Sequence, residues 1–205
     1  MQIAYSADTY ADLIFNEEND QRSYLKSKIE KPFYFFPDKD FNLNLKKFDN
    51  PETIKVLHAP SNPKIKGTEY VRSAIVTLKA EGYQFDYLEY LDLSNLQVLE
   101  RLNKSHIVLN EFFSLAPGVF GVEALANSCA LLTSSDQFLE ESPGTDNQEA
   151  WIVTKHDEIY DNLKLLLEDL ESAKEYARAG YESAFRNAST SRSGARLNDL
   201  LSRIS

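Results

Sequence analysis

Short apolar runs alternate with amphipathic stretches from residue 54 onward. The first run, 54–57, is rich in branched residues and ends just before His58, a pattern typical of a buried strand. Four later runs also have the length and composition of strands: 84–88, 107–109, 130–133 and 151–153. Because each run is followed by a stretch with a different period, the pattern predicts strands separated by helices.

The stretches between these runs have apolar residues at helical spacing. A helix is expected to begin near Thr68, which we take as its N-cap, because Val71, Ile75 and Leu78 lie on one face. Capping-box spacing at Ser94 and Thr154 predicts two further helix starts. Helices are also expected at 121–127, 172–187 and 195–204. Strands alternating with helices predict an α/β fold with a doubly wound parallel sheet.

The first fifty residues have a different pattern. They contain a possible strand at 11–15, a short helix at 21–28 and an aromatic strand at 32–37, followed by a polar stretch without evident structure at 38–52. These pieces are too few for a second core. We therefore interpret residues 1–50 as a partial N-terminal segment with its crossover, and residues 51–205 as the main domain.

Three groups of polar residues are expected at the carboxyl ends of the strands, where open α/β sheets bind ligands. Lys66, Gly67 and Thr68 precede the first helix, and such a lysine beside a helix N-terminus suits an anion, although a solvated loop lysine has the same pattern. His58 also follows the first strand, where contact with a ligand and contact with the loop backbone are equally compatible with the sequence. Asn110 and Glu111 follow the run 107–109, and Tyr90 and Leu91 follow the second strand.

A glycine-rich turn precedes the helix at 121–127. Gly118 and Gly121 flank Val119 and Phe120, and this turn fits either a backbone cradle for a phosphate or an ordinary helix start. Glu123 comes two residues later, where a carboxylate can accept two hydrogen bonds from a vicinal diol or simply favour the helix dipole.

Charge and composition limit the functional classes to which the protein can belong. The 205 residues carry a formal net charge of −10, which argues against a nucleic-acid binder. No apolar run approaches 18 residues, and the single Cys129 excludes an internal disulfide, so a cytoplasmic protein is expected. No two histidines have metal-ligand spacing, so we expect neither a metal site nor a cofactor.

Three sequence blocks together resemble a known family. The blocks HAPSNPKIKGTEYVRSAIVTLKAEGYQFDY, SHIVLNEFF and GVFGVEALANSCALLTSS are similar to the C-terminal half of GT-B-type glycosyltransferases, in particular bacterial group 1 enzymes of polysaccharide synthesis. The resemblance covers about residues 52 to 190. It implies a Rossmann-like domain that binds a nucleotide-diphosphate sugar, whereas a separate N-terminal domain binds the acceptor.

The resemblance also implies roles for individual residues. Lys66 would contact the diphosphate, Glu123 would hold the ribose hydroxyls, and the turn from Gly118 to Gly121 would lie against the phosphates or the sugar. Two positions depart from the family pattern. Leu115 stands where many retaining members have a second acidic residue, and the stretch 62–64 lacks the arginine that usually accompanies the lysine.

The expected function is that of a glycosyltransferase of the hexosyltransferase type, acting on an acceptor glycan or lipid-linked glycan. Because only about fifty residues precede the domain, the opposing wall of the active site is expected from a missing acceptor domain or a homodimer partner, and transfer by this chain alone is expected to be inefficient. The alternative is a non-catalytic nucleotide-sugar-binding module, which Leu115 favours. A nucleotide-sugar epimerase would need acid and base groups that the sequence does not offer.

Overall fold

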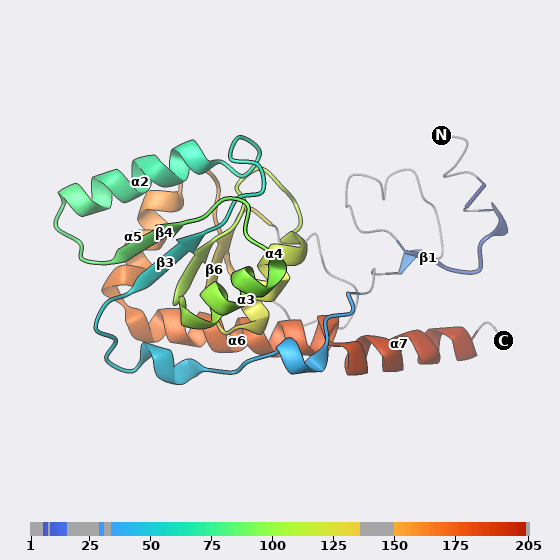
Figure 1. Cartoon of the computed structure of the whole chain (residues 1–205). Coiled ribbons are helices and arrows are strands. Elements are labelled where there is room, and N and C mark those ends of the chain that lie inside the picture. The colour runs from blue at the N-terminus through green and yellow to red at the C-terminus, as the bar shows by residue number, and fades with distance from the viewer. Residues whose placement is uncertain (1–5, 8, 16–28, 31–33, 136–149, 204–205) are drawn as a thin grey trace.

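A five-stranded, all-parallel sheet forms the centre of the main domain (Figure 1). The computed structural model describes residues 6–7, 9–15, 29–30, 34–135 and 150–203. The strands are β3 (Lys55–His58), β4 (Asp86–Glu89), β5 (Ile107–Leu109), β6 (Ala130–Thr133) and β7 (Ile152–Val153), and their order in the sheet is β4-β3-β5-β6-β7. The predicted α/β fold with a doubly wound parallel sheet is therefore confirmed.

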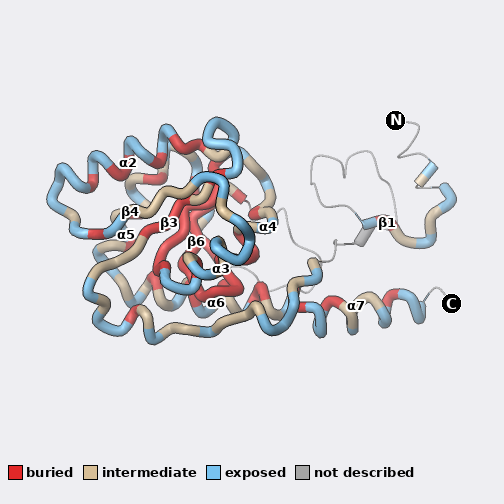
Figure 2. Tube along the Cα trace, viewed as in Figure 1, coloured by how far each residue is buried: buried red, intermediate tan, exposed pale blue. Residues whose placement is uncertain are grey.

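The central strands are buried on both faces, as Figure 2 shows for β3 and β6. Along β5, Ile107 and Leu109 enter one hydrophobic core, whereas Val108 enters the other. Alternate residues of a strand point to opposite faces, so an unbroken apolar run supplies both cores. This explains why these strands appear in the sequence as short continuous apolar runs.

Helices cover both faces of the sheet. They are α2 (Thr68–Ala80), α3 (Asn95–Lys104), α4 (Gly118–Ala126), α5 (Ile159–Glu168), α6 (Leu170–Ala188) and α7 (Thr190–Ser202). One core contains apolar residues of α2 and α5, and the other contains residues of α3 and α4. The capping box at Ser94 is present as predicted.

The starts of α4, α5 and α7 differ from the predicted ones by three residues or more. α4 begins at Gly118 rather than at residue 121, directly after Pro117. The capping box expected at Thr154 is wrong, because α5 begins at Ile159 and the Thr154 hydroxyl instead donates to the Ile152 carbonyl (2.9 Å). α7 begins at residue 190 rather than 195, since the extended backbone of Ser189 ends α6 and a new helix follows at once.

The described parts of the N-terminal segment differ from the structure that the sequence suggested. β1 (Ile14–Phe15) pairs in parallel with β2 (Ile29–Glu30), so the strand expected at 11–15 is shorter. The helix expected at 21–28 lies outside the described residues. Of the aromatic strand expected at 32–37, the described part forms only a single bridge, between Phe36 and Ser189. The polar stretch contains two 3-10 helices, η2 (Asp38–Asp40) and η3 (Leu45–Phe48).

Residues 34–50 lie along the main domain. Phe41 packs edge-on against Phe185 of α6, with ring centroids 5.3 Å apart, and Phe48 is buried in the core beneath the sheet. Lys174 of α6 forms an ion pair with Asp49 (2.7 Å). The proposed domain boundary near residue 50 stays a prediction, but this connecting segment is anchored to α6 along its length.

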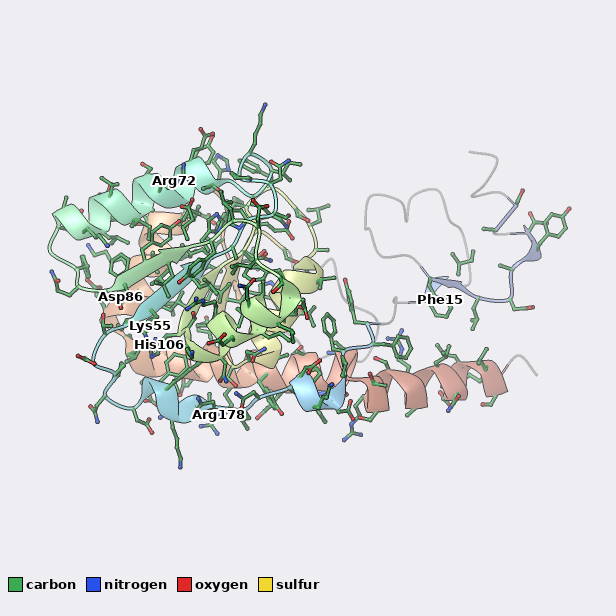
Figure 3. All side chains as sticks on the ribbon, in the orientation of Figure 1. Phe15, Lys55, Arg72, Asp86, His106 and Arg178 are labelled. Carbon is green, nitrogen blue, oxygen red and sulfur yellow. The ribbon has the colours of Figure 1, made fainter. Side chains whose placement is uncertain are left out.

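The amino ends of the strands contact the connecting segment, residues 34–50. At this edge, the His106 ring accepts from the Lys55 N–H (2.9 Å) and donates to the Lys47 carbonyl (2.8 Å), so His106 ties the connecting segment to β3 (Figure 3). The opposite edge, at the carboxyl ends of the strands, contains the cavity described below.

Among the described residues, no helix has both the length and the apolar character needed to cross a membrane.

Candidate functional site

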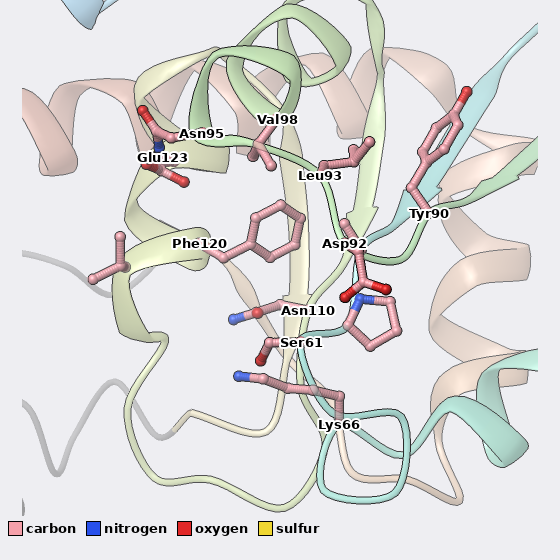
Figure 4. A pocket seen from close by; sticks show the side chains of 13 residues that line it. Ser61, Lys66, Tyr90, Asp92, Leu93, Asn95, Val98, Asn110, Phe120 and Glu123 are labelled. Carbon is pink, nitrogen blue, oxygen red and sulfur yellow. Dashed lines mark hydrogen bonds between the residues drawn. The ribbon is translucent and has the colours of Figure 1, made fainter.

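A cavity of about 510 Å³ opens at the carboxyl ends of β3, β4 and β5 (Figure 4). The chain moves outward from β3 to β4 in one direction and from β5 to β7 in the other, so the sheet has its topological switch point between β3 and β5. Ligands of open α/β sheets bind at this point, and the volume suits a small molecule. The wall consists of Ala59, Pro60, Ser61, Lys66, Tyr90, Asp92, Leu93, Asn95, Val98, Asn110, Val119, Phe120 and Glu123.

Lys66 reaches the cavity from a tightly folded loop. The Lys66 N–H donates to the Asn62 carbonyl (2.9 Å), and the Asn62 side chain accepts from the Lys64 N–H (3.1 Å). The loop therefore closes on itself, and the Lys66 backbone is held within it. The Lys66 ammonium forms an ion pair with Glu111 (2.5 Å), which follows β5.

The helix α2 begins at Thr68 as predicted, but its N-cap is Gly67 rather than Thr68. Gly67 has φ +73°, and a Cβ atom there would lie 3.3 Å from side-chain atoms of both Phe112 and Phe113. Glycine therefore meets a backbone requirement and a packing requirement at once. The Thr68 N–H donates to the Pro63 carbonyl (2.9 Å), so this N–H is not available to an anion.

His58 lies below the cavity and does not line it. Its Nδ1 donates to the Leu109 carbonyl (2.7 Å), which leaves Nε2 to accept from the Thr68 hydroxyl (2.8 Å). Burial lowers the pKa of His58 below its ordinary value and so favours the neutral ring. With both nitrogens engaged, His58 joins β3, β5 and the first residue of α2, and so holds the lysine loop in place.

Asn110 lines the cavity, whereas Glu111 lies beside it. The Asn110 amide donates to the Pro117 carbonyl (2.8 Å), the residue before α4. Gly121 makes this contact possible, because a Cβ atom there would lie 2.8 Å from Asn110 Nδ2 and 2.7 Å from Pro117 Cβ. Gly118 has φ +62° and would bring a Cβ atom to 3.4 Å from Glu111. Neither glycine lines the cavity, and both allow close contacts between the residues that surround its wall.

Glu123 faces the cavity from α4. Its side chain is almost buried, and Oε1 accepts from the Asn95 amide (2.6 Å) of α3. Burial raises the pKa of Glu123, and the hydrogen bond from Asn95 opposes that effect. One carboxylate oxygen is thereby fixed by the protein.

Several cavity residues were not expected from the sequence. Tyr90 lines the wall as expected, but its predicted companion Leu91 does not and is 51% exposed. Asp92 and Asn95 were missed, although the capping box at Ser94 could have indicated them, since it places the start of α3 at the carboxyl end of β4. Leu115, in the position of the family's second acid, is half-exposed and does not line the cavity. In the described part of the chain, no three His, Cys, Asp or Glu side chains gather as metal ligands.

Comparison with known proteins identifies the fold. No family model and no curated protein sequence matches the chain. Among solved structures, HepE from Anabaena in complex with UDP and glucose is 12% identical, with a TM-score of 0.67 over 98% of this chain and 66% of HepE. Sucrose-phosphate synthase from Thermosynechococcus elongatus is 12% identical, with a TM-score of 0.69 over 99% of this chain and 61% of the synthase.

A third solved structure agrees with these two. TarM from S. aureus, in complex with fondaparinux, alpha-GlcNAc-glycerol and UDP, is 10% identical, with a TM-score of 0.66 over 97% of this chain and 45% of TarM. All three are group 1 enzymes of the GT-B type, and the chain has the Rossmann-like fold of their GT-B domains. The chain spans two thirds of their length or less.

Proposed function

We propose that this chain is the donor-binding domain of a glycosyltransferase, which transfers a sugar from a nucleotide-diphosphate sugar to an acceptor hydroxyl. The observation that carries the proposal is the presence of Lys66 and Glu123 in the wall of one cavity at the switch point of the sheet. An ammonium group suits a diphosphate, and a carboxylate suits a ribose diol. The solved complexes of HepE and TarM with UDP support the same class of ligand.

The residues of the cavity perform binding and charge stabilisation in this proposal. Lys66 neutralises the charge that develops on the departing diphosphate, and Glu123 fixes the nucleoside so that the sugar is held in one orientation. The donor serves as a substrate, and we assign no cofactor or metal. We further propose a hexosyltransferase that acts on a glycan or lipid-linked glycan in bacterial polysaccharide synthesis, with the acceptor held by a separate domain or by a second copy of the chain.

Calorimetric titration with a panel of nucleoside diphosphates tests the proposal. Lys66→Ala should weaken the binding of a nucleoside diphosphate by about 1.5–3 kcal/mol, the size of a hydrogen bond to a charged group. Lys64→Ala is the matched control, because Lys64 is an exposed lysine in the same loop that does not line the cavity. Equal affinity of the wild type and Lys66→Ala would refute the assignment of Lys66.

A second variant separates ribose from phosphate recognition. Glu123→Gln keeps the shape of the side chain but removes its charge and one acceptor, so it should weaken nucleotide binding and leave the binding of inorganic pyrophosphate unchanged. Equal losses for the two ligands would place Glu123 at the phosphates or in the folding of the domain. No binding of any nucleotide by the wild type would overturn the proposed function.

A non-catalytic nucleotide-sugar-binding module is the second candidate. Leu115 favours it, because an exposed apolar side chain stands where many retaining members of the family have an acid. Release of nucleoside diphosphate from a nucleotide-sugar in the presence of acceptors distinguishes the two: turnover supports the enzyme, and binding without turnover supports the module.

A further inference from the structure

The side chain of Asn110 has a buried acceptor without a donor. Among the described residues, two buried side-chain atoms have no hydrogen-bond partner, Arg101 Nε and Asn110 Oδ1. The Arg101 guanidinium stacks on the Tyr90 ring, 5.0 Å from its centroid. Asn110 is 1% exposed and lines the cavity, among the polar groups in Figure 4. A polar atom buried in a native protein is normally paired, so Asn110 Oδ1 calls for an explanation.

The orientation of the Asn110 amide is set by its neighbours. Nδ2 donates to the Pro117 carbonyl at 2.8 Å, and the opposite orientation would bring two oxygens together. Gly121 leaves just enough space for this amide, since a Cβ atom at that position would lie 2.8 Å from Nδ2. The contact that holds the amide nitrogen therefore leaves Oδ1 as the atom without a partner.

The cation in the cavity wall, Lys66, is already engaged, because its ammonium pairs with Glu111. A diphosphate has only acceptor oxygens when ionised, so it cannot satisfy Asn110 Oδ1 either. A hydroxyl group can, because it carries one donor hydrogen. A nucleotide-diphosphate sugar has such hydroxyls on its ribose and on its glycosyl group, on either side of the diphosphate.

We propose that Asn110 is a specificity-determining residue whose Oδ1 accepts a hydrogen bond from a sugar hydroxyl of the bound nucleotide-sugar. This inference rests on the proposed function of the cavity and extends it to the recognition of one ligand group. A ligand that lacks this hydroxyl leaves Oδ1 buried without a donor. The deoxy analogue should therefore bind more weakly than the parent ligand.

The experiment combines changes in the protein with changes in the ligand. The probe is UDP-glucose, or GDP-mannose or dTDP-glucose if the wild type prefers another base, together with analogues that each lack one hydroxyl of the ribose or of the glycosyl group. Removal of the hydroxyl that Asn110 reads should weaken binding to the wild type about fivefold to tenfold, the size of one hydrogen bond between neutral groups. Asn110→Ala should bind that analogue and its parent equally, while its response to the other analogues stays as in the wild type.

Asn110→Asp serves as the matched variant. It keeps an oxygen at the Oδ1 position but loses the donor to Pro117, so it should weaken binding in general and still discriminate against the same analogue. A glycosyl analogue as the sensitive ligand assigns Asn110 to the transferred sugar, and a ribose analogue assigns it to the nucleoside. Either result supports the inference.

Three results would overturn the inference. One is that Asn110→Ala discriminates against every analogue as strongly as the wild type does. Another is that the wild type itself is insensitive to the removal of each single hydroxyl, a measurement that does not depend on the folding of any variant. If the wild type binds neither nucleotides nor nucleotide-sugars, the proposed function fails, and the inference fails with it.

Discussion

Lys66 enters the cavity with its charge already paired. Its ammonium lies 2.5 Å from Glu111 Oε2, and both side chains are largely buried. A diphosphate that binds Lys66 must share it with this carboxylate or replace it. Glu111 therefore opposes anion binding in two ways: it competes for the ammonium, and its charge repels the ligand.

Glu111→Gln should strengthen the binding of a nucleoside diphosphate. Removal of one negative charge near the ligand is expected to gain roughly 1 kcal/mol, about fivefold in affinity, after screening by solvent and protein. The gain should shrink at about 1 M salt, where the Debye length falls to about 3 Å. Calorimetry at two salt concentrations measures both effects.

Glu100→Gln is the control for this variant. Glu100 also pairs with a lysine, Lys104 at 2.7 Å, but on the exposed surface of α3, so its replacement should leave affinity unchanged. Weaker binding by Glu111→Gln would mean that Glu111 orients Lys66 for the ligand rather than competing with it.

At the scale of elements, α6 packs against its neighbours through small side chains. Its buried positions include Ala173, Ala177, Gly180 and Ala184. A Cβ atom at position 180 would lie 2.6 Å from Leu125 Cδ2 of α4 and 2.7 Å from the Ala150 carbonyl. The close approach of α6 to α4 therefore requires glycine, although glycine is a poor helix former.

Gly180→Ala should lower the free energy of unfolding by about 1–3 kcal/mol, because overpacking outweighs the gain of up to about 1 kcal/mol in helix propensity. Gly194→Ala in α7 is the matched control, since a Cβ atom there meets nothing within 4 Å and the change should be stabilising. Denaturant unfolding followed by circular dichroism measures both values. If both variants are stabilised, α6 has room that the structure does not show.

At the scale of the whole molecule, two buried histidines connect separate parts of the fold and make its stability depend on pH. His58 joins β3, β5 and α2, and His106 joins β3 and β5 to the connecting segment. Burial lowers the pKa of both rings below the ordinary value of 6.5. Protonation of His106 would place an N–H on Nδ1 against the Lys55 N–H and break that contact.

The free energy of unfolding should therefore fall as the pH drops below about 6.5. In this pH range the two histidines bind more protons in the unfolded chain than in the folded chain. Each histidine therefore contributes at most about 1.4 kcal/mol per pH unit to the slope of the free energy of unfolding against pH. Carboxylates with lowered pKa, such as Glu89, act only below their ordinary value of 4.5. The raised pKa of Glu123 gives a slope of opposite sign above 4.5 and partly offsets the loss.

The fluorescence of Trp151 reports unfolding, because Trp151 is the single tryptophan of the chain and is 3% exposed. Denaturant unfolding followed by its fluorescence, at pH values from about 7 to about 5, gives the pH profile. His106→Gln should have a flatter profile than the wild type. Parallel profiles would show that His106 does not cause the pH dependence.

The sequence by itself determined the layers of the fold and indicated three polar residues of the cavity wall, Lys66, Asn110 and Glu123. The strands at 107–109 and 130–133 were predicted with their observed bounds, because burial on both faces leaves a continuous apolar run that is visible locally. Glu123 was found through the family resemblance, whereas Lys66 and Asn110 were found for a related reason. In a parallel sheet, residues that follow strands gather at one edge, so position along the chain predicts position in space.

Only the tertiary structure decided how these residues are paired. Lys66 and Glu111 are 45 residues apart, and Asn95 and Glu123 are 28 apart. No local period encodes such contacts, because they depend on how loops from different strands pack against one another. The same reason applies to His58. Its position after the first strand was compatible with contact to a ligand or to the loop backbone. In the folded chain its ring contacts Leu109 and Thr68. The periods of helices and strands in the sequence indicate which face of an element is buried. Which residues pack against that face depends on the tertiary structure.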